Sequence, residues 1–364
     1  MRKITQSEMA IVFLDSFEKL EYKHKRGILD GYERAEALFA DNRPISGYFE
    51  KVGKQELAKT ILLTLKDKSL IVEMINEALV GVDDIVTYKD ERYPKELLNT
   101  PFPPLVLYVK GNVELLKTKK VSIVGSRKTL VQYEKVCEEI SFELSKNRIT
   151  VVTGIADGGD ASAIKGGIKN GNIISVLPGG LLSSMKAPRS KMLINEIVNS
   201  GGLVITEHPY LTIPKNYFYP IRNRIIAGLS LGTLIVSGEE DSGARHTANY
   251  AVEYGKEVFC LPYGVGVKSG ELCIDLVKRG ATLVENASEI ASHLGLKFSR
   301  KEKKIDLSEG EKTLYELIKE GVTDTDNLAE RTNMMIFEII STLGMLELKG
   351  AIVKDSSGNY SVIK

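Results

Sequence analysis

The chain of 364 residues has few of the features that mark disulfide-rich, metal-binding or membrane proteins. It contains three cysteines and four histidines, all widely spaced, so neither a disulfide framework nor a Cys/His zinc site is expected. No apolar run approaches the roughly 18 residues of a membrane span, and the first residues do not resemble a signal peptide. These absences predict a cytoplasmic protein with reduced thiols, no metal ion and no membrane partner.

Net charge is also nearly absent, but it is unevenly distributed along the chain. The 49 Lys and Arg against 48 Asp and Glu give a formal charge of +1. Residues 110–300 carry 24 basic and 18 acidic side chains, a balance of +6, whereas residues 305–364 carry 6 and 11, a balance of −5. A nucleic-acid-binding surface is therefore expected in the central region, and the acidic C-terminal region is expected to contact protein rather than DNA.

Composition and periodicity divide the chain into four parts. Residues 1–104 show helical apolar spacing and end at a proline-rich run that cannot continue a helix. Residues 105–296 alternate short β-branched runs with amphipathic segments, the pattern of a doubly wound α/β domain. Residues 297–308 are rich in lysine and are expected to form a linker. Residues 309–364 predict three helices and a hairpin, the outline of a winged helix.

The central domain is expected to hold six parallel strands alternating with six helices. Continuous apolar runs indicate strands buried on both faces, and the alternation requires right-handed crossovers, so we predict an extended Rossmann-like sheet. The strands are expected at residues 121–124, 149–153, 173–177, 203–206, 234–236 and 258–261. The helices are expected at residues 131–146, 161–169, 191–200, 221–230, 244–255 and 270–278.

Glycine-rich loops follow several of these strands, at the edge where open α/β sheets bind ligands. The first is Gly125-Ser126-Arg127, where free N–H groups of the next helix and the arginine side chain suit a phosphate. The second runs from Gly154 to Asp160 and contains three glycines, although Asp160 is also explained as a helix N-cap. The third is Pro178-Gly179-Gly180, with Lys186 shortly beyond it.

The most specific segment spans residues 214–230. It places Lys215, Tyr219 and the block Arg222-Asn223-Arg224 in a loop and the first turn of a helix, a mixture that holds phosphates while bases stack. The alternative is that the aromatic residues lie in the core and the arginines pair with Glu207 or Glu240. Ser242-Gly243 and Thr247 follow the next strand and are expected to complete the same rim.

Signatures of cofactor binding and catalysis are missing. No GxGxxG run follows a strand. Residues 264–269 partly match a P-loop but lack the required glycine before the lysine, so no nucleotide cofactor is expected. No nucleophile, base and acid form a recognisable arrangement, so no catalytic residue is predicted.

Taken in order, these motifs resemble the DNA-processing protein A family (DprA, also called Smf). The resemblance spans about residues 90 to 290 and includes Thr206-Glu207-His208-Pro209 and the run from Arg222 to Gly228. It implies a homodimeric, cytosolic protein that binds single-stranded DNA without sequence preference, protects incoming strands and loads a RecA-type recombinase during natural transformation. It also implies that Gly125, Ser126 and Arg127 hold phosphates, that Lys215 and Tyr219 flank the strand, and that Arg222 supports or contacts it.

Two other functions share some of these features. Nucleotide phosphoribohydrolases resembling lysine decarboxylases also use a Pro-Gly-Gly loop, but they need a Thr and a catalytic Glu soon after it, and Leu181–Met185 supplies neither. A nucleotide-sensing or purely protein-binding role would suit the acidic C-terminal region. We therefore expect a protein that binds single-stranded DNA and is not an enzyme, with a nucleotide-binding or phosphoribohydrolase-like enzyme as the alternative.

Overall fold

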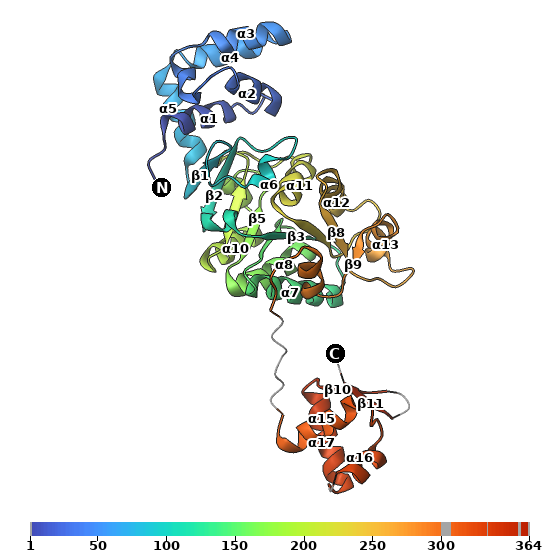
Figure 1. The fold of residues 1–364 in the computed structure, drawn as a ribbon. Coiled ribbons are helices and arrows are strands. Elements are labelled where there is room, and N and C mark those ends of the chain that lie inside the picture. Colours follow the sequence, from blue (N-terminus) through green and yellow to red (C-terminus); the bar gives the residue numbers. More distant parts are fainter. Residues whose placement is uncertain (1, 300–306, 333, 356–357, 363–364) are drawn as a thin grey trace. The chain divides into compact units, whose positions relative to one another are not determined.

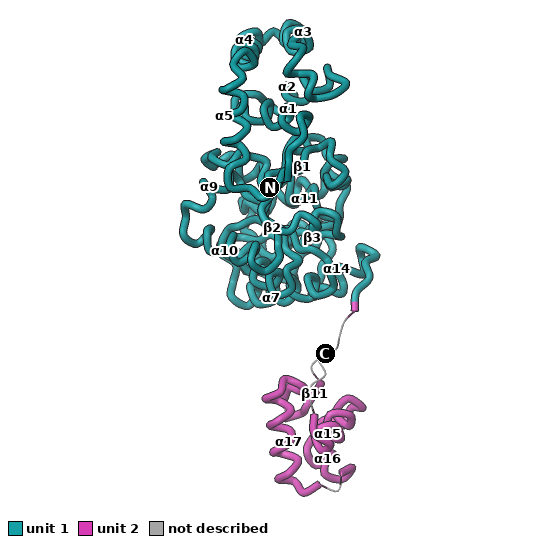
Figure 2. Tube along the Cα trace, turned by 90° about the vertical axis from the view of Figure 1, so that its left-hand side faces the viewer, with its two compact units in different colours: residues 1–298 teal, residues 299–364 magenta. Residues whose placement is uncertain are grey.

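The chain folds into two compact units, described here from a computed structural model (Figure 1). The structure describes residues 2–299, 307–332, 334–355 and 358–362. Unit 1 is Met1–Phe298 and unit 2 is Ser299–Lys364, coloured separately in Figure 2. Each unit has a hydrophobic core of its own. Within the described part of the chain, no helix combines the length and the apolar character needed to cross a membrane.

Unit 1 is built on a sheet of nine strands among its described residues, in the order β1-β2-β6-β5-β4-β3-β7-β8-β9. The strands from β3 to β9 are parallel to one another, and β1 and β2 add an antiparallel edge beside β6. The strands are β1 Asp84–Thr87, β2 Val106–Gly111, β3 Lys120–Val124, β4 Thr150–Thr153, β5 Ile173–Val176, β6 Leu203–Thr206, β7 Gly232–Ile235, β8 Glu257–Cys260 and β9 Thr282–Leu283.

The order of the strands reverses at β3. The chain runs from β3 through β4 and β5 to β6, and then crosses back to place β7, β8 and β9 on the other side of β3. Ser122 of β3 accordingly lies opposite both Val152 of β4 and Thr233 of β7. In open α/β sheets such a reversal creates a crevice beyond the carboxyl ends of the two diverging strands. The loops that follow β3 and β7 therefore border the expected binding crevice.

Helices cover both faces of this sheet, because right-handed crossovers on the two sides of β3 project to opposite faces. Helices α7 and α8 pack together, as do α11 and α12. The helices are α6 Lys95–Leu98, α7 Val131–Lys146, α8 Gly159–Gly167, α9 Leu181–Ser184, α10 Pro188–Asn199, α11 Phe218–Leu229, α12 Ala244–Glu253, α13 Glu271–Lys278 and α14 Ala287–His293. Short 3₁₀ turns are η2 Val113–Lys117, η3 Ile168–Asn170 and η4 Lys268–Gly270.

The N-terminal region is helical and shares the core of unit 1. Its first helix begins with a capping box in which Thr5 and Glu8 satisfy each other's backbone N–H groups. The buried Tyr108 hydroxyl of β2 donates to Asp15 Oδ2 at 3.0 Å, which fastens that helix to the sheet. The elements are α1 Gln6–Asp15, α2 Tyr22–Leu29, η1 Ala35–Phe39, α3 Arg43–Val52, α4 Gln55–Thr64 and α5 Lys68–Leu79.

The α/β architecture predicted from the sequence is confirmed, and the six expected strands correspond to β3 through β8. The structure adds β1, β2 and β9 to the prediction. Strand β1 precedes the expected boundary at residue 104, yet it pairs with β2 in the main sheet. The division between residues 104 and 105 therefore does not coincide with the edge of the sheet.

Unit 2 is the expected winged helix. Its elements are α15 Glu309–Lys319, α16 Thr325–Arg331, α17 Ile336–Leu348 and the antiparallel strands β10 Ile352–Lys354 and β11 Tyr360–Val362. Leu314, Leu328 and Leu343 from its three helices meet in the core. Most of the predicted linker, residues 300–306, and residues 356–357 of the predicted hairpin turn lie outside the described residues.

Candidate nucleic-acid interface

The loops after β3 and β7 are joined by hydrogen bonds at the crevice. The backbone N–H of Ser126 donates to the carbonyl oxygen of Ser237 at 3.1 Å and lies 3.0 Å from its hydroxyl. The Thr129 hydroxyl donates to the Ser126 carbonyl at 2.7 Å and lies 2.6 Å from the Ser237 hydroxyl. These contacts hold Gly125-Ser126-Arg127 in one conformation. A phosphate could therefore bind this loop without first ordering it.

The start of α8 presses against the same loop, and two glycines make this approach possible. Gly158 has a φ of +72°, and a Cβ added to it would lie 2.2 Å from the Ser126 carbonyl oxygen. A Cβ on Gly159 would lie 2.5 Å from Gly125 Cα. The loops after β3, β4 and β7 thus converge. The Arg127 side chain is exposed on this junction and forms no ion pair with any residue in the described parts of the chain.

Arg222 is buried beneath the junction rather than exposed on it. Its guanidinium group donates to the Val176 carbonyl oxygen and, through Nε, to Asn223 Oδ1 at 3.1 Å. A Cβ on Gly154 would lie 2.3 Å from Asp160 Oδ2 and 2.8 Å from Arg222 Nη2, so these two side chains flank the same backbone atom. Arg222 therefore ties α11 to the ends of β4 and β5.

The buried charges of Asp160 and Arg222 stabilise each other. Burial raises the pKa of the Asp160 carboxyl, and the nearby Arg222 charge partly offsets that rise. Burial likewise lowers the pKa of Arg222, and the Asp160 charge opposes that change. The N–H of Ala156 also donates to Asp160 Oδ2 at 3.3 Å. Asp160 is the second residue of α8, whose N-cap is Gly158, so the N-cap interpretation is wrong and Asp160 instead supports the loop.

Arg224 is also unavailable to a ligand. It is 9% exposed and forms an ion pair with Glu207, which is the pairing that the sequence left open as an alternative. Direct contact of a phosphate with the guanidinium group of Arg222 or Arg224 is not compatible with this burial. We therefore set aside direct contact for both, keep the supporting role that was one of the two expected for Arg222, and propose the same role for Arg224.

Gly179 and Gly180 serve packing rather than phosphate binding. A Cβ on Gly180 would lie 2.3 Å from the carbonyl oxygens of both Pro209 and Tyr210, and one on Gly179 would lie 2.9 Å from Pro214 Cδ. The backbone at these positions is covered by the loop after β6. The expectation that these glycines contact DNA is revised for this reason. Thr247, 1% exposed, is likewise too buried for direct contact.

Exposed groups at the start of α11 form a rim beside the junction. Lys215 is exposed, with its Nζ 3.9 Å from Glu18 and 5.6 Å from the centre of the Phe218 ring. Phe218 in turn stacks on His208, with ring centres 4.4 Å apart. Tyr219 is 37% exposed and Tyr217 is 55% exposed, so both rings are accessible to a base.

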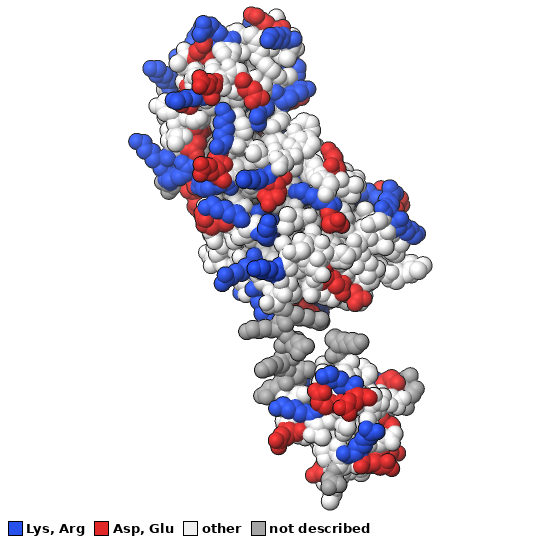
Figure 3. Space-filling model, in the orientation of Figure 1, with Lys and Arg blue, Asp and Glu red and all other residues white. Residues whose placement is uncertain are grey.

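The remaining predicted residues lie on the surface around this region. Asn223 Nδ2 donates to the Gly243 carbonyl oxygen at 3.2 Å, which links α11 to the loop before α12. Gly243 is exposed, and nothing lies within 4 Å of a Cβ placed on it. Ser242 is half-buried, and Lys186 is exposed just after α9. In Figure 3, basic side chains gather beside α10 on the visible face of unit 1.

The sequence reasoning omitted several residues that the geometry brings forward. Ser237 and Thr129 fix the β3 loop, Lys128 is exposed beside Arg127, and Tyr217 is more exposed than Tyr219. Lys128 and Tyr217 lie beside predicted residues in the sequence, and this position could have indicated that they belong to the interface. Ser237 directly follows a predicted strand, but its contact with Ser126 spans 111 positions and has no local signature.

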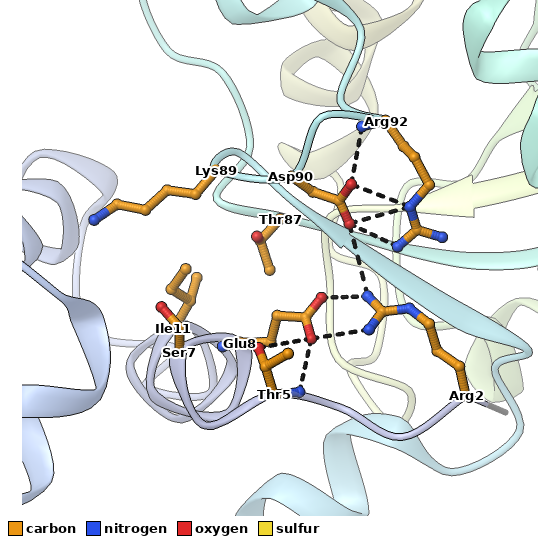
Figure 4. Close-up of a pocket in the computed structure, with 9 residues that line it drawn as sticks. All are labelled: Arg2, Thr5, Ser7, Glu8, Ile11, Thr87, Lys89, Asp90 and Arg92. Atoms are coloured by element: carbon orange, nitrogen blue, oxygen red, sulfur yellow. Dashed lines mark hydrogen bonds and ion pairs between the residues drawn. The ribbon is translucent and has the colours of Figure 1, made fainter.

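A separate polar cavity of about 480 Å³ lies between α1 and β1 (Figure 4). Both of its arginines are paired: Arg2 contacts Glu8, Asp84 and Asp90. Arg92 also contacts Asp84 and Asp90, each at 2.6 Å. The network pairs two arginines with three carboxylates and anchors the N-terminal segment to the sheet. Among the described residues Lys89 is the one lining cation without an ion pair, and the three nearby carboxylates disfavour an anionic ligand beside it.

Comparison with known proteins relates most of the chain to one family. Residues 84–295 match the family described as DNA recombination-mediator protein A, and residues 299–358 match the DprA winged helix domain. Protein Smf from Escherichia coli is 33% identical over 300 residues, covering 79% of this chain and 78% of that protein. DNA processing protein DprA from Bacillus subtilis is 33% identical over 211 residues, covering 57% and 70%.

Solved structures agree with this relationship. DNA processing protein A from Streptococcus pneumoniae superposes with a TM-score of 0.62 at 25% identity, covering 82% of this chain and all of that one. The Helicobacter pylori protein, whose structure is described as showing a single-stranded DNA binding mode, gives a TM-score of 0.53 at 27% identity, covering 59% and 98%. The chain therefore belongs to the DNA-processing protein A (DprA/Smf) family.

Proposed function

We propose that this protein binds single-stranded DNA without sequence preference through the junction of the β3, β4 and β7 loops and the rim at the start of α11. The observation that carries the proposal is the exposed Arg127, without an ion-pair partner in the described chain, on a loop already fixed by Ser237 and Thr129. Lys215 and the two exposed tyrosines supply a second cation and stacking surfaces. A related protein from Helicobacter pylori is described as binding single-stranded DNA, which supports the assignment.

The proposed binding is electrostatic and is completed by stacking. Arg127 and Lys215 would neutralise backbone phosphates and release counterions, so affinity should fall as salt rises. Tyr217 and Tyr219 would stack on bases, which is tolerant of sequence because every base has an aromatic face. Arg222 and Asp160 would hold the surface in shape without touching the strand.

Binding without catalysis is also part of the proposal. The Pro178-Gly179-Gly180 loop, which a phosphoribohydrolase would need for its substrate, is covered by residues 209–214. The segment α9 that follows contains leucine and serine but no glutamate. These observations favour a DNA-binding protein over the enzyme alternative.

We further propose that the protein acts as a cytoplasmic homodimer that protects incoming single strands and loads a RecA-type recombinase during transformation. Membership of the family supports this role. The test is whether the protein accelerates assembly of a RecA-type recombinase on single-stranded DNA, with light scattering to measure its own mass. No acceleration would limit the function to DNA binding.

Fluorescence anisotropy with labelled single- and double-stranded oligonucleotides tests DNA binding directly. We expect preference for single strands, affinity that rises with strand length, and weaker binding at higher salt. Arg127→Ala should lower affinity by about tenfold, since it removes a charged hydrogen bond. It should also reduce the slope of log affinity against log salt by about 0.7, the value for one phosphate contact on a single strand.

A matched control separates local from general charge effects. Arg34 is an exposed arginine just before η1, and Arg34→Ala makes the same change of net charge away from the loops after β3, β4 and β7. Equal losses for the two variants would contradict the assignment of Arg127. Tight binding of a mononucleotide without dependence on strand length would favour the nucleotide-binding alternative.

A further inference from the structure

Helix α17 of the winged helix is apolar on opposite faces. Ile339, Leu343 and Leu346 point into the core of unit 2 and are fully buried. Phe337, Ile340 and Leu348 share the opposite side, because they are three and eight residues apart on a helix of 3.6 residues per turn. They are 63%, 58% and 84% exposed. Figure 2 places α17 along one side of unit 2, with α15 and α16 beside it.

Two more apolar side chains widen this surface. Ile336 and Met345 flank the three residues and are also exposed, and we call these five residues the α17 apolar face. A helix that is apolar all round is normally buried, and contiguous exposed apolar surface on a small domain usually marks an interaction site. The fold of unit 2 does not require this face, because its core is complete without it.

The charges on α17 indicate what kind of partner would cover the face. Its charged residues are Glu338 and Glu347, and no Lys or Arg occurs between Arg331 and Lys349. The two glutamates are nine positions apart, which places them half a circle apart around the helix and about 13 Å apart along its axis. Both carboxylates are exposed. The apolar face therefore has an acidic group at each side and no cation.

This pattern disfavours the partner that a winged helix would ordinarily be assigned. In a DNA-reading helix-turn-helix the equivalent helix enters the major groove and needs Lys or Arg near the phosphates. On α17, the carboxylates of Glu338 and Glu347 would instead be repelled by the DNA phosphates. The −5 balance of residues 305–364 adds to that repulsion and also opposes pairing between two copies of unit 2.

We infer that the α17 apolar face binds an amphipathic helix of a partner protein whose apolar stripe is flanked on both sides by Lys or Arg. Apolar burial against Phe337, Ile340 and Leu348 would supply most of the affinity. The flanking cations would pair with Glu338 and Glu347 and would set the specificity. This inference concerns unit 2 and does not depend on DNA binding by unit 1.

The test mixes the full-length protein with labelled synthetic helical peptides of roughly five turns. Fluorescence anisotropy measures their binding. One peptide carries a leucine stripe flanked by lysines, a second carries the same stripe flanked by glutamates, and a third is a scramble of the first. We expect the lysine-flanked peptide to bind more than about tenfold tighter than the other two. Equal binding of the scrambled peptide would overturn the inference, because charge alone would then explain the binding.

Variants locate the binding to the face. Phe337→Glu should abolish peptide binding, whereas Leu63→Glu, at a comparably exposed leucine of α4, should leave it unchanged. The double variant Glu338→Lys with Glu347→Lys should reverse the preference toward the glutamate-flanked peptide. Glu338 also accepts a hydrogen bond from the Met335 backbone N–H at 2.9 Å. Circular dichroism of each variant therefore comes first, and peptide binding is compared among variants that keep the wild-type helix content. Retained binding in Phe337→Glu would overturn the inference.

Two other possible occupants of the α17 apolar face would give distinct results with the same variants. Sedimentation that shows self-association lost in Phe337→Glu would assign the face to a second copy of the chain. Double-stranded DNA binding lost in Phe337→Glu would assign it to DNA. Either result would overturn the inference, and neither would bear on single-stranded DNA binding by Arg127.

Discussion

Gly159, the first residue of α8, and Gly243, just before α12, border the same proposed interface but have opposite surroundings. A Cβ on Gly159 would meet the backbone of Gly125 at 2.5 Å, whereas nothing lies within 4 Å of one on Gly243. Gly159→Ala is therefore expected to lower the free energy of unfolding by about 1–3 kcal/mol, as overpacking does. Gly243→Ala should change it by less than about 0.5 kcal/mol. Urea unfolding measures both, and equal effects would contradict the close approach of the two loops.

Arg222 and Asp160 predict a stability effect that depends on pH. Arg222→Met leaves the buried Asp160 carboxylate without its cation, which should cost about 3–5 kcal/mol at pH 8. Burial already raises the pKa of Asp160 above its ordinary 3.8, and loss of Arg222 should raise it further. Between pH 3.8 and the raised pKa, the native variant holds a proton that the unfolded chain has released. Its stability therefore falls as pH rises through that range and levels off above the raised pKa.

The loss caused by Arg222→Met should consequently be smaller at pH 5 than at pH 8. Urea unfolding of the wild-type protein and the variant at the two pH values gives the difference directly. Adding Asp160→Asn to the variant removes the titrating group and should remove the extra pH dependence. A loss of the same size at both pH values would mean that the Asp160 charge is not coupled to Arg222.

These residues also show how far sequence reasoning reaches. The glycine and arginine motifs were sufficient to indicate the loops that form the junction, because each follows a β-branched run. They did not indicate which arginine is exposed, since Arg127 follows a predicted strand and Arg222 and Arg224 begin a predicted helix, and both places suit an arginine that faces solvent. Exposure depends on contacts such as Arg222 with Val176 and Arg224 with Glu207, which are 46 and 17 residues apart. Those contacts have no signature in the local sequence.

At the scale of elements, the first helix of unit 2 depends on a capping box. The N–H of Glu311 donates to the Ser308 hydroxyl at 3.4 Å, and the N–H of Ser308 donates to Glu311 Oε2 at 2.6 Å. Ser308→Ala should destabilise unit 2 by about 1 kcal/mol. Ser341→Ala, in the exposed middle of α17, should be neutral or slightly stabilising because alanine favours helix. Thermal unfolding distinguishes the two, and equal effects would rule out the cap as the cause.

Among the elements, the central parallel strands were the most predictable and the edge strands the least. Strands such as β3, β4 and β5 are buried on both faces. Such strands appear in the sequence as continuous apolar runs, which is why they could be predicted. Strand β9 has only two residues, and β1 only four, so neither produces a distinct run. Strand β2 follows the proline-rich segment, and its antiparallel pairing with β6 joins residues about a hundred positions apart.

At the scale of the whole molecule, the separate cores of the two units predict separate unfolding transitions. Leu343 is fully buried in unit 2 and Ile123 is fully buried in unit 1. Leu343→Ala should destabilise unit 2 by about 2–5 kcal/mol and leave the unit 1 transition unchanged, and Ile123→Ala should do the reverse. Calorimetry and hydrogen exchange of the full chain resolve the two transitions.

DNA binding gives this prediction a functional readout. Because the proposed interface lies entirely in unit 1, Leu343→Ala should retain affinity for single-stranded DNA at temperatures where unit 2 has unfolded. Ile123 belongs to β3, the strand that leads into Gly125-Ser126-Arg127, so Ile123→Ala should lose affinity as unit 1 unfolds. A loss of DNA affinity in Leu343→Ala that follows the unfolding of unit 2 would show that the winged helix contributes to the interface. We expect affinity to be retained, because residues 305–364 carry an acidic balance of −5. Unfolding unit 2 therefore should not remove cations on which binding of single-stranded DNA depends.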